Sequence, residues 1–179
     1  YNIYHFYIRK KDFPMKYSFV DLDETLIHTN GNDESVDLFG AIKIDFDGDL
    51  YYTAYRTGAR EFLKKIRELS DKTFMLTIAT DDYAEKMNEL FEFGFDKNDI
   101  YSRYDLRGSP KQPVRRPDLI PGSVFLFDNL SYHENYEKVN FLHAYGKLSY
   151  TKVPAFYGHG DLYPELIEEL TSKLKETEV

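Results

Sequence analysis

The segment Lys16-Tyr17-Ser18-Phe19-Val20-Asp21-Leu22-Asp23-Glu24-Thr25 is the most informative part of the chain for the fold. Its first half is a short apolar run, and the length of this run and its Tyr, Phe and Val content favour a buried strand over a helix. The carboxylates of Asp21 and Asp23 follow directly. The sequence therefore predicts a buried strand with an acidic cluster at its C-terminal end.

Two further apolar runs, 74–78 and 123–127, also end in polar residues. Segments 59–69 and 83–93 carry apolar residues at helical spacing and flank the first of these runs. Alternation of strands and helices predicts an α/β fold with a central, mostly parallel sheet flanked by helices. We also expect weaker strands near 99–104 and 152–156, and a closing helix over 164–174 with Pro164 in its first turn.

A hairpin is expected just after the first strand. Residues 41–46 and 50–56 alternate roughly between polar and apolar around Asp47-Gly48, a dipeptide suited to the positive φ angles of a tight turn. The remaining stretches between motifs are short and leave no room for a large cap domain. We expect a small β-hairpin flap beside an open cleft.

Length and composition indicate one domain, which we place at 15–179. Residues 1–14 precede Met15 and are interpreted as an N-terminal extension without an assigned function, either an edge strand, a leader or an addition to the natural chain. The net charge of −8 argues against broad binding to nucleic acids or anionic membranes, although a local basic patch stays open. No run approaches the ~20 apolar residues of a membrane span, so we expect a soluble intracellular protein.

The chemistry must come from oxygen and nitrogen groups, because the chain has no cysteine for thiolate catalysis or metal ligation. Ligands of open parallel sheets bind at the carboxyl ends of the strands. A set of polar residues falls at such ends: Asp21, Asp23, Thr77, Asp128 and Asn129. These oxygen-bearing groups suit Mg²⁺, which prefers hard ligands.

Each of these features also has a structural interpretation. Asp21 and Asp23 alone could form a solvated acidic turn with Thr25 capping a helix. Thr77 could be an ordinary β-branched strand residue, and Asp128-Asn129 a turn after a strand. His28 is interpreted as a packed or hydrogen-bonded histidine. The spacing of His133, His143 and His159 does not suggest a zinc site.

The whole set of motifs resembles a known family. Residues 21–29, Asp-Leu-Asp-Glu-Thr-Leu-Ile-His-Thr, are similar to the first motif of haloacid-dehalogenase-type (HAD) phosphatases, in the NLI-interacting-factor-like branch that dephosphorylates the C-terminal domain of RNA polymerase II. The segments 56–63, 77–84 and 127–129 follow in the order of that branch. The resemblance spans roughly residues 16–174 and implies a Rossmann-like HAD fold. Thr57 departs from it, since the family usually has proline there.

The resemblance implies a Mg²⁺-dependent phosphatase. Asp21 would attack phosphorus to form an aspartyl-phosphate, and Asp23 would act as general acid and then general base. Thr77 and Lys111 would be catalytic groups that also bind the phosphate, together with Thr25 and Arg56. The metal ligands would come from Asp21, Asp23, Asp128 and Asn129, with Asp23 contributing its main-chain carbonyl and Asp128 supporting the shell.

The cation at Lys111 lies between Pro110 and Pro113, with Arg115 and Arg116 as nearby substitutes. Together with Arg103 and Arg107 these residues are the basic concentration of an acidic chain, either a solvated face or a contact for a phosphorylated partner.

Three functions remain to be compared. The first is hydrolysis of phosphoserine or phosphothreonine in a protein or peptide, the second is a phosphatase of the same type acting on a nucleotide or polynucleotide end, and the third is a non-catalytic phosphate-binding module.

Overall fold

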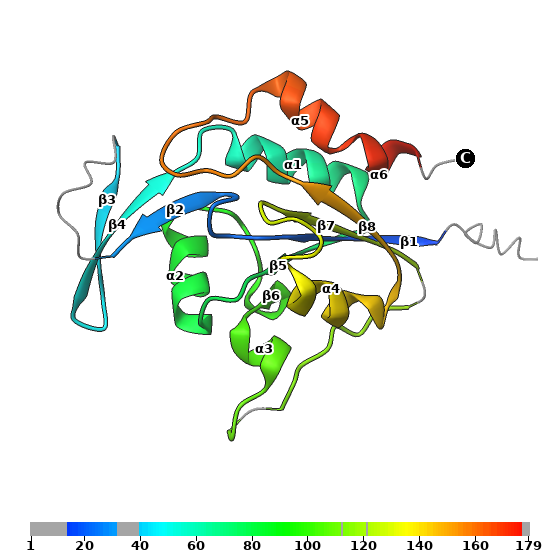
Figure 1. The fold of residues 1–179 in the computed structure, drawn as a ribbon, viewed down its shortest axis with the longest axis horizontal. Helices are drawn as coiled ribbons and strands as arrows, with labels where there is room; N and C mark the ends of the chain where they lie inside the picture. Colours follow the sequence, from blue (N-terminus) through cyan, green and yellow to red (C-terminus); the bar gives the residue numbers. More distant parts are fainter. Residues whose placement is uncertain (1–13, 32–39, 112, 121, 177–179) are drawn as a thin grey trace, which may run out of the picture.

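The computed structural model describes residues 14–31, 40–111, 113–120 and 122–176. The expected N-terminal extension, except Pro14, lies outside these residues. Figure 1 shows a central sheet between two layers of helices, with a smaller sheet projecting beyond one end. The α/β class and the small flap are confirmed, and the elements of the described residues include no large cap domain.

Five parallel strands form the central sheet in the order β6-β5-β1-β7-β8. Their bounds are β1 Met15–Val20, β5 Lys72–Leu76, β6 Ile100–Tyr101, β7 Gly122–Asp128 and β8 Gly146–Lys152. β1 is central, and the chain leaves it toward β5 on one side and reaches β7 on the other. The strand order therefore switches at β1, which is where open α/β sheets bind ligands.

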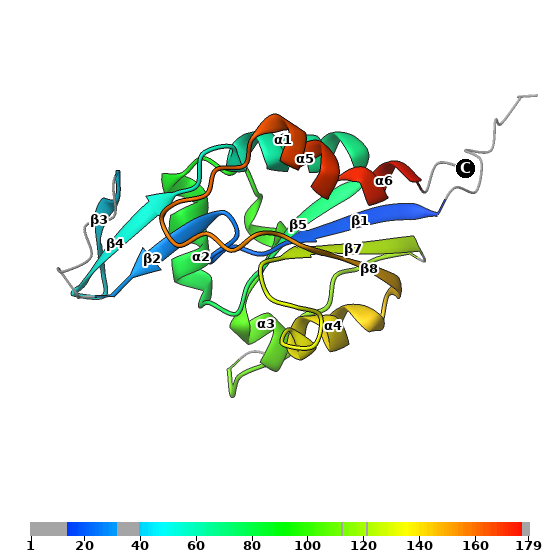
Figure 2. The same cartoon turned by 45° about the horizontal axis from the view of Figure 1, so that its top comes forward.

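Alternate side chains of β1 build the two halves of the core. Phe19 faces Phe74 and Leu126 in one apolar cluster, and Val20 faces Met75 and Phe127 in the other. Helices α1 (Ala59–Leu69), α5 (Pro164–Leu170) and α6 (Ser172–Glu176) lie over one face, and α3 (Arg103–Arg107) and α4 (Tyr136–His143) lie under the other (Figures 1 and 2). Burial on both faces explains why β1 reads as an apolar run.

The smaller sheet is antiparallel, in the order β2-β4-β3. β3 (Ile42–Phe46) and β4 (Asp49–Tyr55) form the predicted hairpin, and its turn residue Asp47 has a φ of 54°. β2 (Ile27–Asn30), which the sequence analysis did not predict, pairs with β4. The tight turn between β1 and β2 has Glu24 at a φ of 56°, so β2 starts beside the carboxyl end of β1.

Helix and strand bounds differ from the predicted ones in several places. α1 matches its prediction, and α2 (Asp81–Leu90) begins two residues earlier than expected. The strand expected at 152–156 was wrong, since β8 ends at Lys152 before Val153-Pro154, and Pro cannot continue a hydrogen-bonded ladder. The strand expected at 99–104 shrinks to β6, which the 3₁₀ turn Lys97–Asp99 precedes and α3 follows.

The closing helix is divided at Thr171. The Thr171 hydroxyl donates a hydrogen bond to the Ile167 carbonyl at 2.8 Å. This bond to the preceding turn competes with the regular main-chain hydrogen bonds between α5 and α6. α4 was not predicted at all, although it contributes to the site described next. No helix among the described residues is long and apolar enough to cross a membrane.

Candidate active site

A pocket of about 560 Å³ opens at the carboxyl ends of β1, β5 and β7. Asp21 and Asp23 follow β1, Thr77 follows β5, and Asn129 follows β7. These four residues line the pocket together. Neighbouring strands β5, β1 and β7 bring them to one edge, as the sequence predicted.

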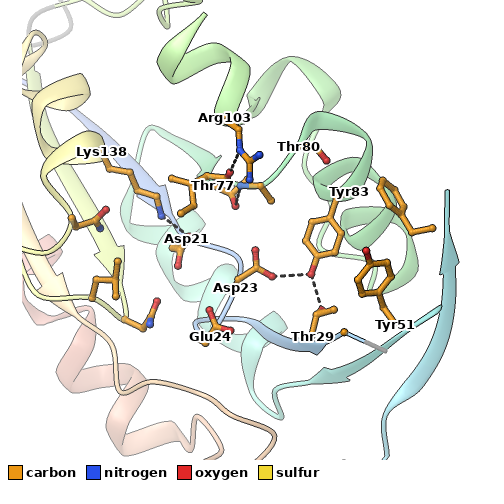
Figure 3. Close-up of a pocket in the computed structure, with 17 residues that line it drawn as sticks. Asp21, Asp23, Glu24, Thr29, Tyr51, Thr77, Thr80, Tyr83, Arg103 and Lys138 are labelled. Atoms are coloured by element: carbon orange, nitrogen blue, oxygen red, sulfur yellow. Dashed lines mark hydrogen bonds and ion pairs between the residues drawn. The ribbon is translucent and has the colours of Figure 1, made fainter. Parts of the chain in front are cut away.

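Lys138, on α4, is buried at the base of this pocket. Its Nζ lies 2.5 Å from Asp21 Oδ1 (Figure 3). The same Nζ lies 2.7 Å from Asp128 Oδ2. Burial alone would lower the pKa of Lys138, but the two carboxylates raise it above its ordinary value. The ammonium group is therefore charged at neutral pH and touches Asp21 directly.

Asp21 is almost entirely buried, 5% exposed, and still lines the pocket. Burial raises its pKa, and the ammonium group of Lys138 limits that rise. Its main-chain amide donates to the Phe127 carbonyl at 3.0 Å, which fixes the end of β1 against β7. One oxygen, Oδ1, is bound to Lys138, and the other, Oδ2, faces Thr25 and Asn129.

Asp23 points toward α2 and accepts a hydrogen bond from the Tyr83 hydroxyl, O to Oδ1, at 2.8 Å (Figure 3). Burial raises the pKa of Asp23 to about 6, and the hydrogen bond from Tyr83 acts in the opposite direction. Burial and the nearby Asp23 carboxylate raise the pKa of Tyr83, so its hydroxyl keeps its proton. A carboxyl group with the pKa of Asp23 can both give and take a proton near neutral pH.

The Asn129 amide reaches across from β7 to the acidic turn. One of its two terminal atoms lies 3.1 Å from Asp21 Oδ2 and 3.2 Å from the Asp23 main-chain carbonyl oxygen. As a nitrogen, that atom donates to both acceptors. If that atom is the amide oxygen, it forms a set of three oxygens with Asp21 Oδ2 and the Asp23 carbonyl. Its separations of 3.1 and 3.2 Å from them are close to the spacing of about 3 Å between adjacent ligands of an octahedral Mg²⁺ with bonds of about 2.1 Å. The donor set therefore fits Mg²⁺.

No group of three His, Cys, Asp or Glu side chains in the part of the chain that the structure describes could hold a metal ion. A magnesium site here would rest on one carboxylate, one amide and one main-chain carbonyl. Mg²⁺ keeps several waters and takes few protein ligands, so this small set is sufficient for it.

Comparison with known proteins identifies the family. The model of the NLI interacting factor-like phosphatases matches residues 18–109, more than half of the chain. The chain belongs to this family. This family is the branch that the sequence resembled. No curated protein matches the sequence.

Solved structures that match this chain include two of Fcp1, an RNA polymerase II CTD phosphatase. The fission yeast protein bound to beryllium fluoride is 18% identical with a TM-score of 0.48, over 92% of this chain and 51% of that one. A second Fcp1 structure is 21% identical with a TM-score of 0.49, over 91% of this chain and 49% of that one. The HAD domain of the Legionella pneumophila effector Lem4 is 14% identical with a TM-score of 0.45, over 92% and 98%. This chain spans about half the length of the Fcp1 chains.

The structure does not bring Lys111 to the pocket of this phosphatase domain. Lys111 is exposed in the loop after α3, and only its main-chain amide has a described bond, to Ser109 Oγ. The substitute Arg115 is paired with Asp105 at 2.9 Å and lies over the Tyr101 ring. Lys138 occupies the place that the sequence analysis gave to Lys111. A signal for it existed, since Lys138 follows β7 closely and the segment after β7 starts at the same edge.

Two residues expected to bind phosphate point elsewhere. Thr25 is fully buried behind Asp21, and its hydroxyl lies 3.2 Å from Asp21 Oδ2 and 3.3 Å from Asn129 Oδ1. Arg56 is 1% exposed and lies outside the pocket. Asp128, expected at the metal, instead uses one oxygen for Lys138 and the other for the Leu130 amide.

Arg56 connects the acidic turn to the segment after β8. It donates to the carbonyls of Thr25 at 3.1 Å, Pro154 at 2.7 Å and Gly160 at 2.8 Å. Burial lowers its pKa to about 10, which leaves the guanidinium charged at neutral pH. Arg56 is thus a structural residue that holds three main-chain carbonyls.

Replacing Arg56 by lysine is expected to lower the free energy of unfolding by about 3 kcal/mol, because one ammonium group cannot serve three separated carbonyls in a buried site. Urea denaturation measures this change. The matched control is Arg60→Lys, since Arg60 meets Glu92 on the exposed surface and its replacement should cost under about 0.5 kcal/mol. A raised KM with unchanged stability in Arg56→Lys would instead support the role in substrate binding.

Proposed function

We propose that the protein is a Mg²⁺-dependent phosphomonoester hydrolase that forms an aspartyl-phosphate on Asp21. The observation that carries this proposal is the contact of buried Lys138 with Asp21 at the base of an open pocket. A carboxylate held by a fixed cation is an oriented nucleophile, and the same cation offsets the charge of an incoming phosphate.

Asp21 and Asp23 divide the chemistry. An Asp21 oxygen attacks phosphorus, and the bond between phosphorus and the leaving oxygen breaks as Asp23 supplies the proton for that oxygen. Water then attacks the aspartyl-phosphate and gives its proton to Asp23, which restores both side chains. The raised pKa of Asp23 supports its role as the proton donor.

Thr77 is placed to bind the transferred group. It lines the pocket at the end of β5, and its Oγ1 accepts a hydrogen bond from the Ala79 amide at 3.1 Å. The hydroxyl hydrogen of Thr77 stays available to a phosphoryl oxygen. Lys138, which also lines the pocket, provides a second, charged donor.

Mg²⁺ would be held by Asp21, Asn129 and the Asp23 main-chain carbonyl, and when bound it supplies positive charge that stabilises the phosphoryl oxygens. Chelation of divalent ions is expected to lower hydrolysis at least about 10²-fold, because this stabilisation is worth several kcal/mol. Thermal unfolding in Mg²⁺ and in chelator provides a second readout, with a higher Tm in Mg²⁺. Undiminished turnover in chelator would contradict the metal requirement.

A phosphoserine or phosphothreonine of a protein or peptide is the proposed substrate. The pocket is open, the described residues place no large cap domain over it, and Phe46, Tyr51 and Tyr83 form an apolar wall beside the acidic residues. Such a wall suits the residues that flank a phosphorylated side chain. A small metabolite would need fuller enclosure.

The alternative substrate, a phosphorylated polynucleotide end, requires free positive charge around the pocket. Within the described residues, Arg107 is paired with Glu137 and Arg115 with Asp105, and only Arg103 of this basic group lines the pocket. Because Arg107 and Arg115 are already paired with carboxylates, they offer no free positive charge to a polynucleotide, which favours the peptide as the substrate. Phosphopeptides should therefore be hydrolysed faster than oligonucleotides with 3′- or 5′-phosphates, and the reverse order would support the alternative.

A further inference from the structure

Tyr83 ends a row of hydroxyl groups that runs from the small sheet to Asp23. Thr53 Oγ1 lies 2.8 Å from Thr29 Oγ1, which lies 2.6 Å from the Tyr83 hydroxyl oxygen, and this oxygen lies 2.8 Å from Asp23 Oδ1. Thr53 and Thr29 are register partners on β4 and β2. The row therefore ties Asp23 to the flap as well as to α2.

The number of hydroxyl hydrogens determines the direction of the hydrogen bonds along this row. Each hydroxyl has one hydrogen to donate. Tyr83 donates its hydrogen to Asp23, so it must accept from Thr29, and Thr29 must then accept from Thr53. Thr53 is fully buried, which shields the start of the row from competing water. The Tyr83 hydroxyl is thus held with its hydrogen directed at Oδ1.

This direction has a consequence for the two oxygens of Asp23. Oδ1 is occupied as an acceptor, so a proton on the carboxyl group belongs on Oδ2. Figure 3 shows the second oxygen of Asp23 pointing away from Tyr83. A general acid must present its protonated oxygen to the leaving group, and small errors in this geometry cost rate.

We propose that Tyr83 is a positioning residue: its hydroxyl, oriented by Thr29 and Thr53, holds Asp23 with Oδ2 toward the leaving oxygen. This inference rests on the proposed function. In the first step the Asp21 oxygen bonds to phosphorus, the bond to the leaving oxygen breaks, and the Oδ2 proton passes to that oxygen. Tyr83 donates its hydrogen bond throughout and transfers no proton.

Tyr83→Phe tests the proposal because it removes only the hydroxyl and keeps the ring, which packs edge-on against Phe46 at 6.0 Å between centroids. The readout is the rate of leaving-group release in the first turnover, so that water attack on the aspartyl-phosphate does not enter. Two substrates are compared. A phosphoserine peptide needs a proton on its leaving oxygen, whereas p-nitrophenyl phosphate releases a stable anion that needs none.

We expect Tyr83→Phe to slow the first turnover of the phosphoserine peptide at least about tenfold and that of p-nitrophenyl phosphate less than about threefold, since general acid catalysis contributes about 10²–10⁴-fold. KM should change little. Thr29→Val removes the donor that orients Tyr83 and should give a smaller effect with the same substrate dependence. Tyr163→Phe, at an exposed tyrosine outside the pocket, is the matched control and should change neither rate.

An equal loss for both substrates, or no loss, would overturn the role of Tyr83. If Tyr83→Phe does not fold, Thr29→Val decides by the same comparison. Asp21→Asn is measured in parallel: leaving-group release by that variant would refute the proposed function itself. Loss in Asp21→Asn together with equal losses in Tyr83→Phe would refute only the positioning role.

Discussion

Replacement of Asp21 by asparagine is expected to lower kcat for aryl phosphates and phosphopeptides at least about 10⁴-fold, because an amide cannot form the covalent intermediate and removal of a nucleophile abolishes nearly all chemical catalysis. The fold should survive. The substituted side chain has nearly the same shape, and Lys138 retains Asp128 as a partner at 2.7 Å. Steady-state kinetics together with a thermal unfolding curve measure both expectations.

The matched control for this change is Asp118→Asn. Asp118 is an exposed aspartate outside the pocket, so the same chemical replacement should leave kcat within about twofold and stability within about 0.5 kcal/mol. Turnover by Asp21→Asn within tenfold of the original chain would contradict the role of Asp21 as nucleophile.

Replacement of Lys138 by methionine is expected to lower kcat/KM about 10²–10³-fold, the usual cost of losing one preorganised donor at the reacting charge. The variant also leaves the Asp21 and Asp128 carboxylates together without their cation. Removal of one partner from a buried ion pair is destabilising by about 3–5 kcal/mol. We therefore expect a lowered Tm that Mg²⁺ partly restores, since the metal adds positive charge beside Asp21.

Lys111→Met provides the comparison that separates the two lysines. Lys111 is exposed and lies outside the pocket, so its replacement should leave kcat/KM within about twofold. A large loss in Lys111→Met with normal kinetics in Lys138→Met would show that the sequence expectation was right and the geometric assignment wrong.

The parts of the site that could be predicted from sequence are those that end buried parallel strands. Asp21, Thr77 and Asn129 each follow an apolar run, and the switch in strand order at β1 brings their strands side by side. The period of the apolar residues and the position of the polar groups after them were sufficient to predict that these residues lie at one edge of the sheet. No side-chain contact had to be known.

Lys138 was missed because the helix that carries it has only a weak apolar pattern. α4 has eight residues, and Val139 and Leu142 are its only fully buried apolar side chains, too few for a clear helical period. The prediction of the cation therefore fell on the more conspicuous basic loop before β7. Arg107 and Arg115 of that region are instead paired with Glu137 and Asp105.

The roles of Thr25 and Arg56 were misjudged for a different reason. A motif gives the identity of a residue and its place along the chain, but not the direction in which its side chain points. Both side chains turn into the protein, where Thr25 supports Asp21 and Arg56 binds three carbonyls. Such buried polar groups are kept by the hydrogen bonds that they satisfy, which only the packed structure reveals.

A crystal structure of the protein with Mg²⁺ and beryllium fluoride, which mimics a phosphoryl group bonded to a carboxylate, would show directly whether Asp21 is the nucleophile. We expect beryllium bonded to an Asp21 oxygen, Lys138 in contact with that carboxylate or the fluorides, and Mg²⁺ held by Asp21, Asn129 and the Asp23 carbonyl. Beryllium bonded to any other residue would contradict the assignment of Asp21 as the nucleophile.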